Sequence, residues 1–146
     1  MAIHGLRFES MNRLQDIIET FNSVDPETRL DLLLDFSNKL PPLPAKYQQA
    51  AAEGLGRVPE CMTPVFLFTE KENGRVHILA EVAEEAPTLK GFISIIVRAY
   101  DGAPAEEIAE APLDLVDQLG LAGAIRMNRA MGLSAIVSRI RSAAAA

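Results

Sequence analysis

The feature that most constrains this chain is an Asn-Gly pair placed between two short apolar runs. Asn73 and Gly74 separate the run VFLF from the run VHIL. A type I′ turn needs a positive φ at both central residues, and Asn-Gly adopts that conformation with little strain. The sequence therefore predicts a β-hairpin over residues 64–82. Two strands alone are only marginally stable in water, so we expect a third strand near residues 55–58 and helices over one face.

Apolar residues recur at helical spacing on both sides of this hairpin. The clearest helix start is Asp25-Pro26, because Asp suits the N-cap and Pro suits the first helical position. Ser10 is expected to cap the first helix. The expected helices lie at 10–21, 25–40, 45–53, 87–100, from 103 onward, 112–119 and 128–142. This pattern predicts an α+β fold in one domain over residues 1–146, with 1–9 and 142–146 as mobile tails.

Composition and charge exclude several classes of protein. The chain has 146 residues, of which 49% are hydrophobic and 23% charged, which is typical of one globular domain. Its net charge of −6 argues against non-specific nucleic-acid binding, which needs a basic face. The sequence contains neither an apolar run of membrane-spanning length nor a signal-peptide pattern. We therefore expect a cytoplasmic protein without membrane association, or a mature form whose targeting segment has been removed.

The charges are unevenly distributed near the C-terminus. Residues 101–120 carry six acidic residues and no Lys or Arg, whereas residues 121–146 carry four arginines and no acid. Solvated faces of opposite sign would explain this pattern, and so would a surface for a partner protein. Arg126 and Arg129 lie at the expected start of the last helix, where cations are disfavoured. Carboxylates of a partner would account for them.

Cys61 is the only cysteine, and it decides which sulfur chemistry is available. A disulfide within the chain and a zinc site with several cysteines are impossible, and the chain alone should not hold an iron–sulfur cluster. A free cysteine is commonly a small buried hydrophobe. A cysteine in a loop can instead be a reactive thiol. Glu60 should raise the pKa of this thiol, and Arg57 should oppose that effect.

The histidines and the common motifs add little. His77 falls in the expected hairpin, so a Cys61–His77 pair is conceivable for a cysteine enzyme, whereas His4 lies near the N-terminus. The chain has no glycine-rich nucleotide-binding motif, no His-Glu-x-x-His and no EF-hand loop.

Five short segments occur in an order and spacing that is similar to a known family. They are Val58–Phe66 around the cysteine, the Asn73-Gly74 turn, Glu84–Phe92, Tyr100–Gly102 with Pro104 and Glu107-Ile108, and Arg129-Ala130-Met131-Gly132-Leu133. On these segments the chain resembles the SufE family of cysteine desulfuration proteins, which support iron–sulfur cluster assembly. One departure concerns the cysteine loop itself, since Glu60 stands where the family usually has glycine.

The resemblance implies a fold and a function. The fold would be α+β, with a small antiparallel sheet of about three strands packed against helices, as in IscU-type scaffolds. The protein would accept persulfide sulfur from a pyridoxal-phosphate-dependent, SufS-like cysteine desulfurase onto Cys61, stimulate that enzyme and deliver sulfur to a SufBCD-like scaffold. Arg129 and Glu85 would contact the desulfurase, while Gly91 and Gly132 would permit close helix packing. The chain itself would need no cofactor and no metal.

Two other functions stay open from the residues alone. One is a protein-binding module that engages a desulfurase or another partner while its cysteine is inert. The other is an independent cysteine enzyme that uses His77 as its base. Thiol labelling separates the first from sulfur transfer, and activity without a partner would indicate the second.

Overall fold

The computed structural model describes the backbone of residues 9–123 and 127–146, and the side chains of residues 10–123 and 132–146. The fold is α+β, as predicted. In chain order the elements are α2 (Glu9–Asn22), α3 (Pro26–Ser37), α4 (Ala45–Ala52), β1 (Val65–Glu72), β2 (Arg75–Val82), α5 (Pro87–Tyr100), β3 (Ala103–Pro104), α6 (Ala105–Ile108), α7 (Leu115–Gln118) and α8 (Met127–Ala145).

The predicted hairpin is confirmed. Strands β1 and β2 pair antiparallel, from Val65 opposite Val82 at the open end to Glu72 opposite Arg75 at the turn. Asn73 and Gly74 have φ values of 55° and 79°, which is the left-handed conformation that this turn requires. The open end of the hairpin is therefore fixed at the point where the cysteine loop enters β1.

The third strand lies elsewhere than predicted. Strand β3 pairs with β2, so the sheet order is β1-β2-β3 and the expectation of a strand at 55–58 was wrong. That segment makes only an isolated antiparallel bridge along β1, between Arg57 and Phe66. Gly54 and Gly56 both have positive φ, so the chain turns there and cannot extend into a regular strand.

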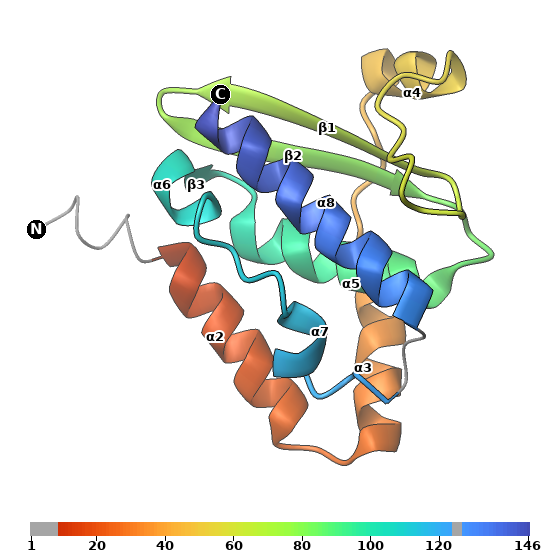
Figure 1. Cartoon of the computed structure of the whole chain (residues 1–146), viewed down its shortest axis with the longest axis vertical. Coiled ribbons are helices and arrows are strands. Elements are labelled where there is room, and N and C mark those ends of the chain that lie inside the picture. The colour runs from red at the N-terminus through yellow and green to blue at the C-terminus, as the bar shows by residue number, and fades with distance from the viewer. Residues whose placement is uncertain (1–8, 124–126) are drawn as a thin grey trace, which may run out of the picture.

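Helix α5 is the centre of the fold (Figure 1). It lies between the hairpin and the pair α2 and α3, and residues on nearly every side of it are buried. Alternate residues of β2, from Val76 to Val82, are buried on the face of the sheet that packs against it. A Cβ atom at Gly91 would collide with the backbone carbonyl of Leu33. Glycine at this position therefore permits the close approach of α5 to α3, as expected.

The ends of several helices differ from the predictions. The Asp25 side chain caps α3 by accepting a hydrogen bond from the Thr28 N–H at 2.8 Å, as predicted, but the helix ends at Ser37 rather than near residue 40. Ser10 lies inside the first turn of α2 and donates a hydrogen bond to Glu107 at 2.6 Å, so it does not cap the helix.

The C-terminal tail was expected to be mobile from residue 142. Instead α8 continues to Ala145, and Ala144 is buried. Residues 1–8 of the expected N-terminal tail lie outside the described residues. Helix α8 begins near the cysteine loop and runs beside the hairpin toward its turn, where Lys71 donates to the Ala146 carbonyl at 2.6 Å (Figure 1). Within the described part of the chain, no helix has the length and apolar character needed to cross a bilayer.

Candidate functional site

The site is the loop of residues 59–64, which carries Cys61 between α4 and β1. Its two ends are joined, because the Val58 N–H donates to the Val65 carbonyl at 2.9 Å. Val58 itself is buried in the core and anchors the start of the loop. Inside the loop, the Cys61 N–H donates to the Val58 carbonyl at 3.2 Å. This backbone hydrogen bond therefore closes the loop at its base, and the tip of the loop depends on other contacts.

The Cys61 side chain points inward and lies against helix α8. It is only 7% exposed. Its S–H donates a long hydrogen bond to the Gly132 carbonyl, with 3.9 Å between sulfur and oxygen. A Cβ atom at Gly132 would lie 3.2 Å from the sulfur, which is tighter than ordinary van der Waals contact. Glycine at 132 therefore leaves the space that the thiol occupies, which gives the predicted close packing of this residue a specific partner.

This environment favours the protonated thiol. Burial raises the pKa of Cys61 above its ordinary value, and the neighbouring Glu60 carboxylate raises it further. The guanidinium groups of Arg139 and Arg57 act in the opposite direction but do not reverse the shift. The directions expected for Glu60 and Arg57 are thus both present, although burial has the largest effect. In this arrangement the thiol is a poor nucleophile at neutral pH.

An ion pair that the sequence reasoning missed joins the loop to α8. Arg139 donates from Nε to Glu60 Oε1 at 3.1 Å and from Nη2 to Glu60 Oε2 at 3.2 Å. Arg139 lies seven residues after Gly132, so the two share one face of the helix about 10 Å apart. That spacing was the available signal, but it becomes informative only once Cys61 is known to sit on Gly132.

Comparison with known proteins assigns the sequence that forms this site to a family. The family model described as SufE, Fe-S metabolism associated domain, matches residues 15–144. The chain belongs to the SufE family. It is 38% identical over 129 residues to a SufE-like protein of Mycobacterium tuberculosis, with 88% of each chain covered.

Two further relatives of this SufE chain bear on function and fold. It is 31% identical over 119 residues to the sulfur acceptor protein CsdE of Escherichia coli K12, covering 80% of this chain and 77% of CsdE. The solution structure of a hypothetical protein from Thermus thermophilus matches with a TM-score of 0.79 at 31% identity, covering 91% of this chain and 93% of the other.

The two predicted partner-binding residues of the SufE chain are described to different extents. Glu85 is exposed in the loop between β2 and α5. Because Val82 pairs with Val65, this loop leaves the sheet at the same end as the cysteine loop. The backbone of Arg129 lies in the first turn of α8, but its side chain is outside the described residues, as is all of Arg126.

His77 is not placed beside the thiol. It pairs with Glu70 in the hairpin, five residues along β1 from Val65, which corresponds to about 17 Å of strand. Its ring lies 3.5 Å from Asp101 and 4.0 Å from Glu72, at the turn end of the hairpin. The structure therefore gives no support to a Cys61–His77 pair, and His4 lies outside the described residues.

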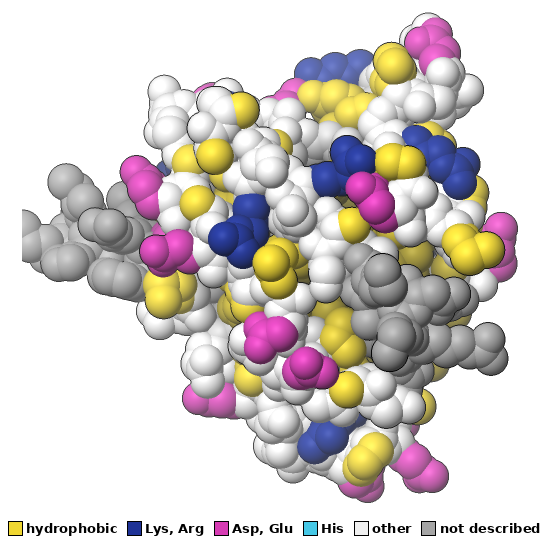
Figure 2. Space-filling model, viewed as in Figure 1, with side chains coloured by type: hydrophobic (Ala, Val, Ile, Leu, Met, Phe, Trp, Pro, Cys, Tyr) yellow, Lys and Arg dark blue, Asp and Glu magenta, His cyan; other side chains and the backbone are white. Residues whose placement is uncertain are grey.

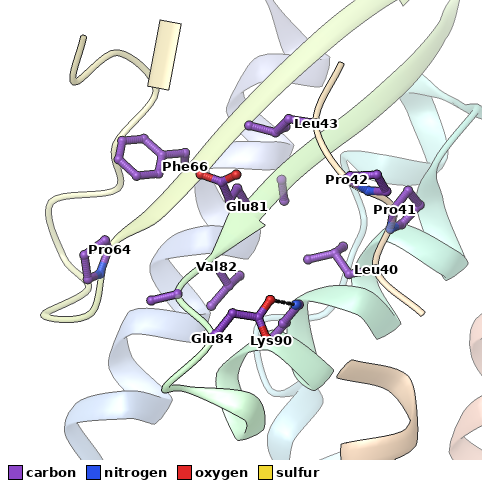
Figure 3. A pocket seen from close by; sticks show the side chains of 12 residues that line it. Leu40, Pro41, Pro42, Leu43, Pro64, Phe66, Glu81, Val82, Glu84 and Lys90 are labelled. Carbon is purple, nitrogen blue, oxygen red and sulfur yellow. Dashed lines mark hydrogen bonds and ion pairs between the residues drawn. The ribbon is translucent and has the colours of Figure 1, made fainter. Parts of the chain in front are cut away.

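A groove of about 440 Å³ lies beside the cysteine loop on the face of the sheet that carries Phe66 and Glu81 (Figure 3). The segment 40–43 forms one wall, and Pro64, the last residue of the loop, lies at its edge. Lys90 donates to Glu84 at 2.6 Å inside it. Cys61 is not among the residues that line the groove.

The acidic side chains of the stretch 101–120 are mostly exposed. Glu107 is buried, whereas Asp101, Glu106, Glu110, Asp114 and Asp117 lie at the surface. Asp101 accepts a hydrogen bond from the Ile78 N–H, and Asp114 accepts one from Gln118. On the face shown in Figure 2, acidic, basic and hydrophobic side chains are interspersed. Among the side chains that the structure describes, no cluster of three or more His, Cys, Asp or Glu residues could hold a metal ion.

Proposed function

We propose that this chain is a sulfur-acceptor protein of iron–sulfur metabolism whose acceptor atom is Cys61 Sγ. The observation that carries the proposal is the position of the only cysteine, on a loop that is closed at its base and seated on Gly132, in a chain of the SufE family. The similarity to the sulfur acceptor protein CsdE supports the same chemistry.

The proposed reaction is a displacement between sulfur atoms. The Cys61 thiol loses its proton to solvent, and the thiolate attacks the outer sulfur of a persulfide on the partner's cysteine. A bond forms between Cys61 Sγ and that sulfur while the sulfur–sulfur bond of the partner breaks. The partner's cysteine leaves as a thiolate, and Cys61 holds the persulfide. No external oxidant or reductant is needed, because the sulfane sulfur is transferred at its existing oxidation level.

Accessibility decides when this reaction can occur. In the closed arrangement the sulfur is buried and its pKa is raised, so attack requires the loop to move away from α8. Opening would expose the sulfur and remove the main cause of the raised pKa. Transfer would then be confined to complexes in which the loop is open, which protects the thiol at other times.

The partners follow from this role. The donor would be a SufS-like cysteine desulfurase with its own pyridoxal phosphate, which would turn over faster once its cysteine is freed. The acceptor would be a SufBCD-like scaffold complex in the cytoplasm. Glu85, at the same end of the sheet as Cys61, and Arg129, at the start of α8, are proposed to contact the desulfurase.

Intact-mass measurement tests the proposal directly. The protein is incubated with a cysteine desulfurase, pyridoxal phosphate and L-cysteine, without reductant. We expect a mass gain of one or more sulfur atoms that is absent in Cys61→Ser, together with desulfurase stimulation that this variant loses while it retains its fold. Full stimulation by Cys61→Ser would overturn the proposal.

The burial of Cys61 favours one alternative, a binding module with an inert cysteine. That module would bind the desulfurase but would gain no sulfur in the same experiment. Its thiol would react with an alkylating reagent only after denaturation, whether or not the desulfurase is present. Reaction of Cys61 in the native protein when the desulfurase is bound would exclude this alternative.

A further inference from the structure

The tip of the cysteine loop has few contacts that hold it to the rest of the molecule. Between residues 59 and 63, one backbone–backbone hydrogen bond, Cys61 to Val58, lies within the described part of the chain. The sulfur contacts the Gly132 carbonyl at a distance of 3.9 Å, which is a weak interaction. Met62, next to the cysteine, is 86% exposed, so it does not anchor the tip. Among the side chains that the structure describes, the Glu60–Arg139 pair is the one ion pair between this tip and α8.

The geometry of that pair suits an ion pair that can form and break while the protein stays folded. Both carboxylate oxygens of Glu60 are used, each by a different nitrogen of Arg139. A two-point pair of this kind fixes orientation as well as distance. The two side chains are 46% and 44% exposed, so water and a competing partner can reach them. An exposed pair contributes only modestly to stability, which means that it can shift an equilibrium without locking it.

We propose that Glu60 and Arg139 are positioning residues for Cys61, whose ion pair holds the loop on α8 and sets the fraction of molecules in which the sulfur is accessible. This inference rests on the proposed function, since it assigns the control of sulfur transfer to two residues that do not touch the transferred atom. Glu60 stands at the position before the cysteine, so a movement of the loop backbone that separates Glu60 from Arg139 also shifts Cys61 relative to Gly132.

Arg139 has two effects on the thiol, and they have opposite consequences for reactivity. As part of the ion pair it keeps the sulfur covered, which lowers reactivity. As a nearby cation it favours the thiolate, together with Arg57 and against Glu60, which raises reactivity. Removing the charge of Arg139 therefore separates the two effects. If the pair holds the loop, the thiol becomes more accessible; if Arg139 acts only through its charge, the thiol becomes less reactive.

The experiment measures the rate of Cys61 alkylation by iodoacetamide in the isolated native protein over a range of pH. The plateau at high pH reports accessibility, and the midpoint reports the pKa of the thiol. We expect Arg139→Gln to raise the plateau about two- to fivefold. Glu60→Gln should raise it to a similar or smaller extent. The Glu60→Arg variant should raise it as well, and Glu60→Arg with Arg139→Glu should return it toward the native value.

Lys46→Gln is the matched control. It breaks the exposed Lys46–Glu70 ion pair of 2.8 Å, which joins α4 to β1 away from the loop, and should leave the alkylation profile unchanged. Circular dichroism and the melting temperature confirm that each variant folds. An unchanged plateau in Arg139→Gln, or a double charge reversal that restores nothing, would overturn the proposal.

The two proposals can fail separately. Alkylation uses a small reagent and no desulfurase, whereas sulfur acceptance is read from intact mass. Variants that change the alkylation plateau in a protein that accepts no sulfur would support the positioning pair and reject the proposed function. Sulfur acceptance with an unchanged plateau in the variants would reject the positioning pair alone.

Discussion

At the scale of single residues, the Cys61 sulfur occupies space that a side chain at position 132 would need. The glycine has no side chain where the sulfur lies, and a Cβ atom there would be 3.2 Å from it. Glycine inside a helix is normally unfavourable by about 1 kcal/mol relative to alanine. Its presence in α8 is therefore explained by the sulfur that it accommodates.

A double-mutant cycle tests this pairing. Gly132→Ala alone adds helix propensity but presses on the sulfur, so its two effects on the free energy of unfolding oppose each other. In the Cys61→Ala background the pressure is gone, and Gly132→Ala should stabilise the protein by about 0.5–1 kcal/mol. We expect a gain that is smaller, or reversed, in the native background, measured by urea denaturation. Equal effects in both backgrounds would mean that the two positions are not coupled.

At the scale of elements, the central helix α5 is placed by Gly91. Because a Cβ atom there would meet the backbone of Leu33 rather than a movable side chain, α3 would have to shift as a unit. Such a shift would disturb Phe92 and Leu33, which are both almost fully buried.

Gly91→Ala should therefore destabilise the protein by about 1–3 kcal/mol, although alanine is the better helix former. The measurement is the midpoint and slope of urea unfolding. Ser138→Ala, at an exposed position of α8, provides the control and should change stability by less than about 0.5 kcal/mol. A neutral or stabilising effect of Gly91→Ala would show that α3 and α5 are not held at this distance.

At the scale of the whole molecule, the alkaline limit of stability depends on a buried phenol. Burial raises the pKa of Tyr100 to about 12, and the nearby Glu107 carboxylate adds to the shift. The unfolded chain, with an ordinary pKa near 10, loses this proton first. The contribution of the Tyr100 phenol to the free energy of unfolding is therefore fully present below about pH 10 and is lost as the pH rises toward 12.

Tyr100→Phe removes this dependence. Between about pH 10 and 12 the melting temperature of the variant should fall less steeply than that of the native protein. The raised pKa of Cys61 acts in the same direction, so both proteins are compared in the Cys61→Ala background. Parallel curves for the two proteins would indicate that the phenol is not protonated preferentially in the folded state.

The local features of the fold could be predicted from the sequence because they depend on neighbouring residues. Asn73-Gly74 specifies its turn through backbone conformation, and Asp25 caps α3 through a residue three positions away. The third strand could not be placed in this way. Pairing of β3 with β2 depends on how the chain returns after α5, and no local pattern in a two-residue strand marks it.

The same division applies to the candidate site. The proposed acceptor atom could be named from the sequence, because the chain has one cysteine, and the directions in which Glu60 and Arg57 shift the pKa of its thiol could also be predicted. The burial of the sulfur on Gly132 and the hydrogen bond from Arg139 to Glu60 became visible in the folded chain alone. These contacts join positions more than 70 residues apart in the sequence. Their geometry is set by the packing of α8 beside the hairpin, which no short segment encodes.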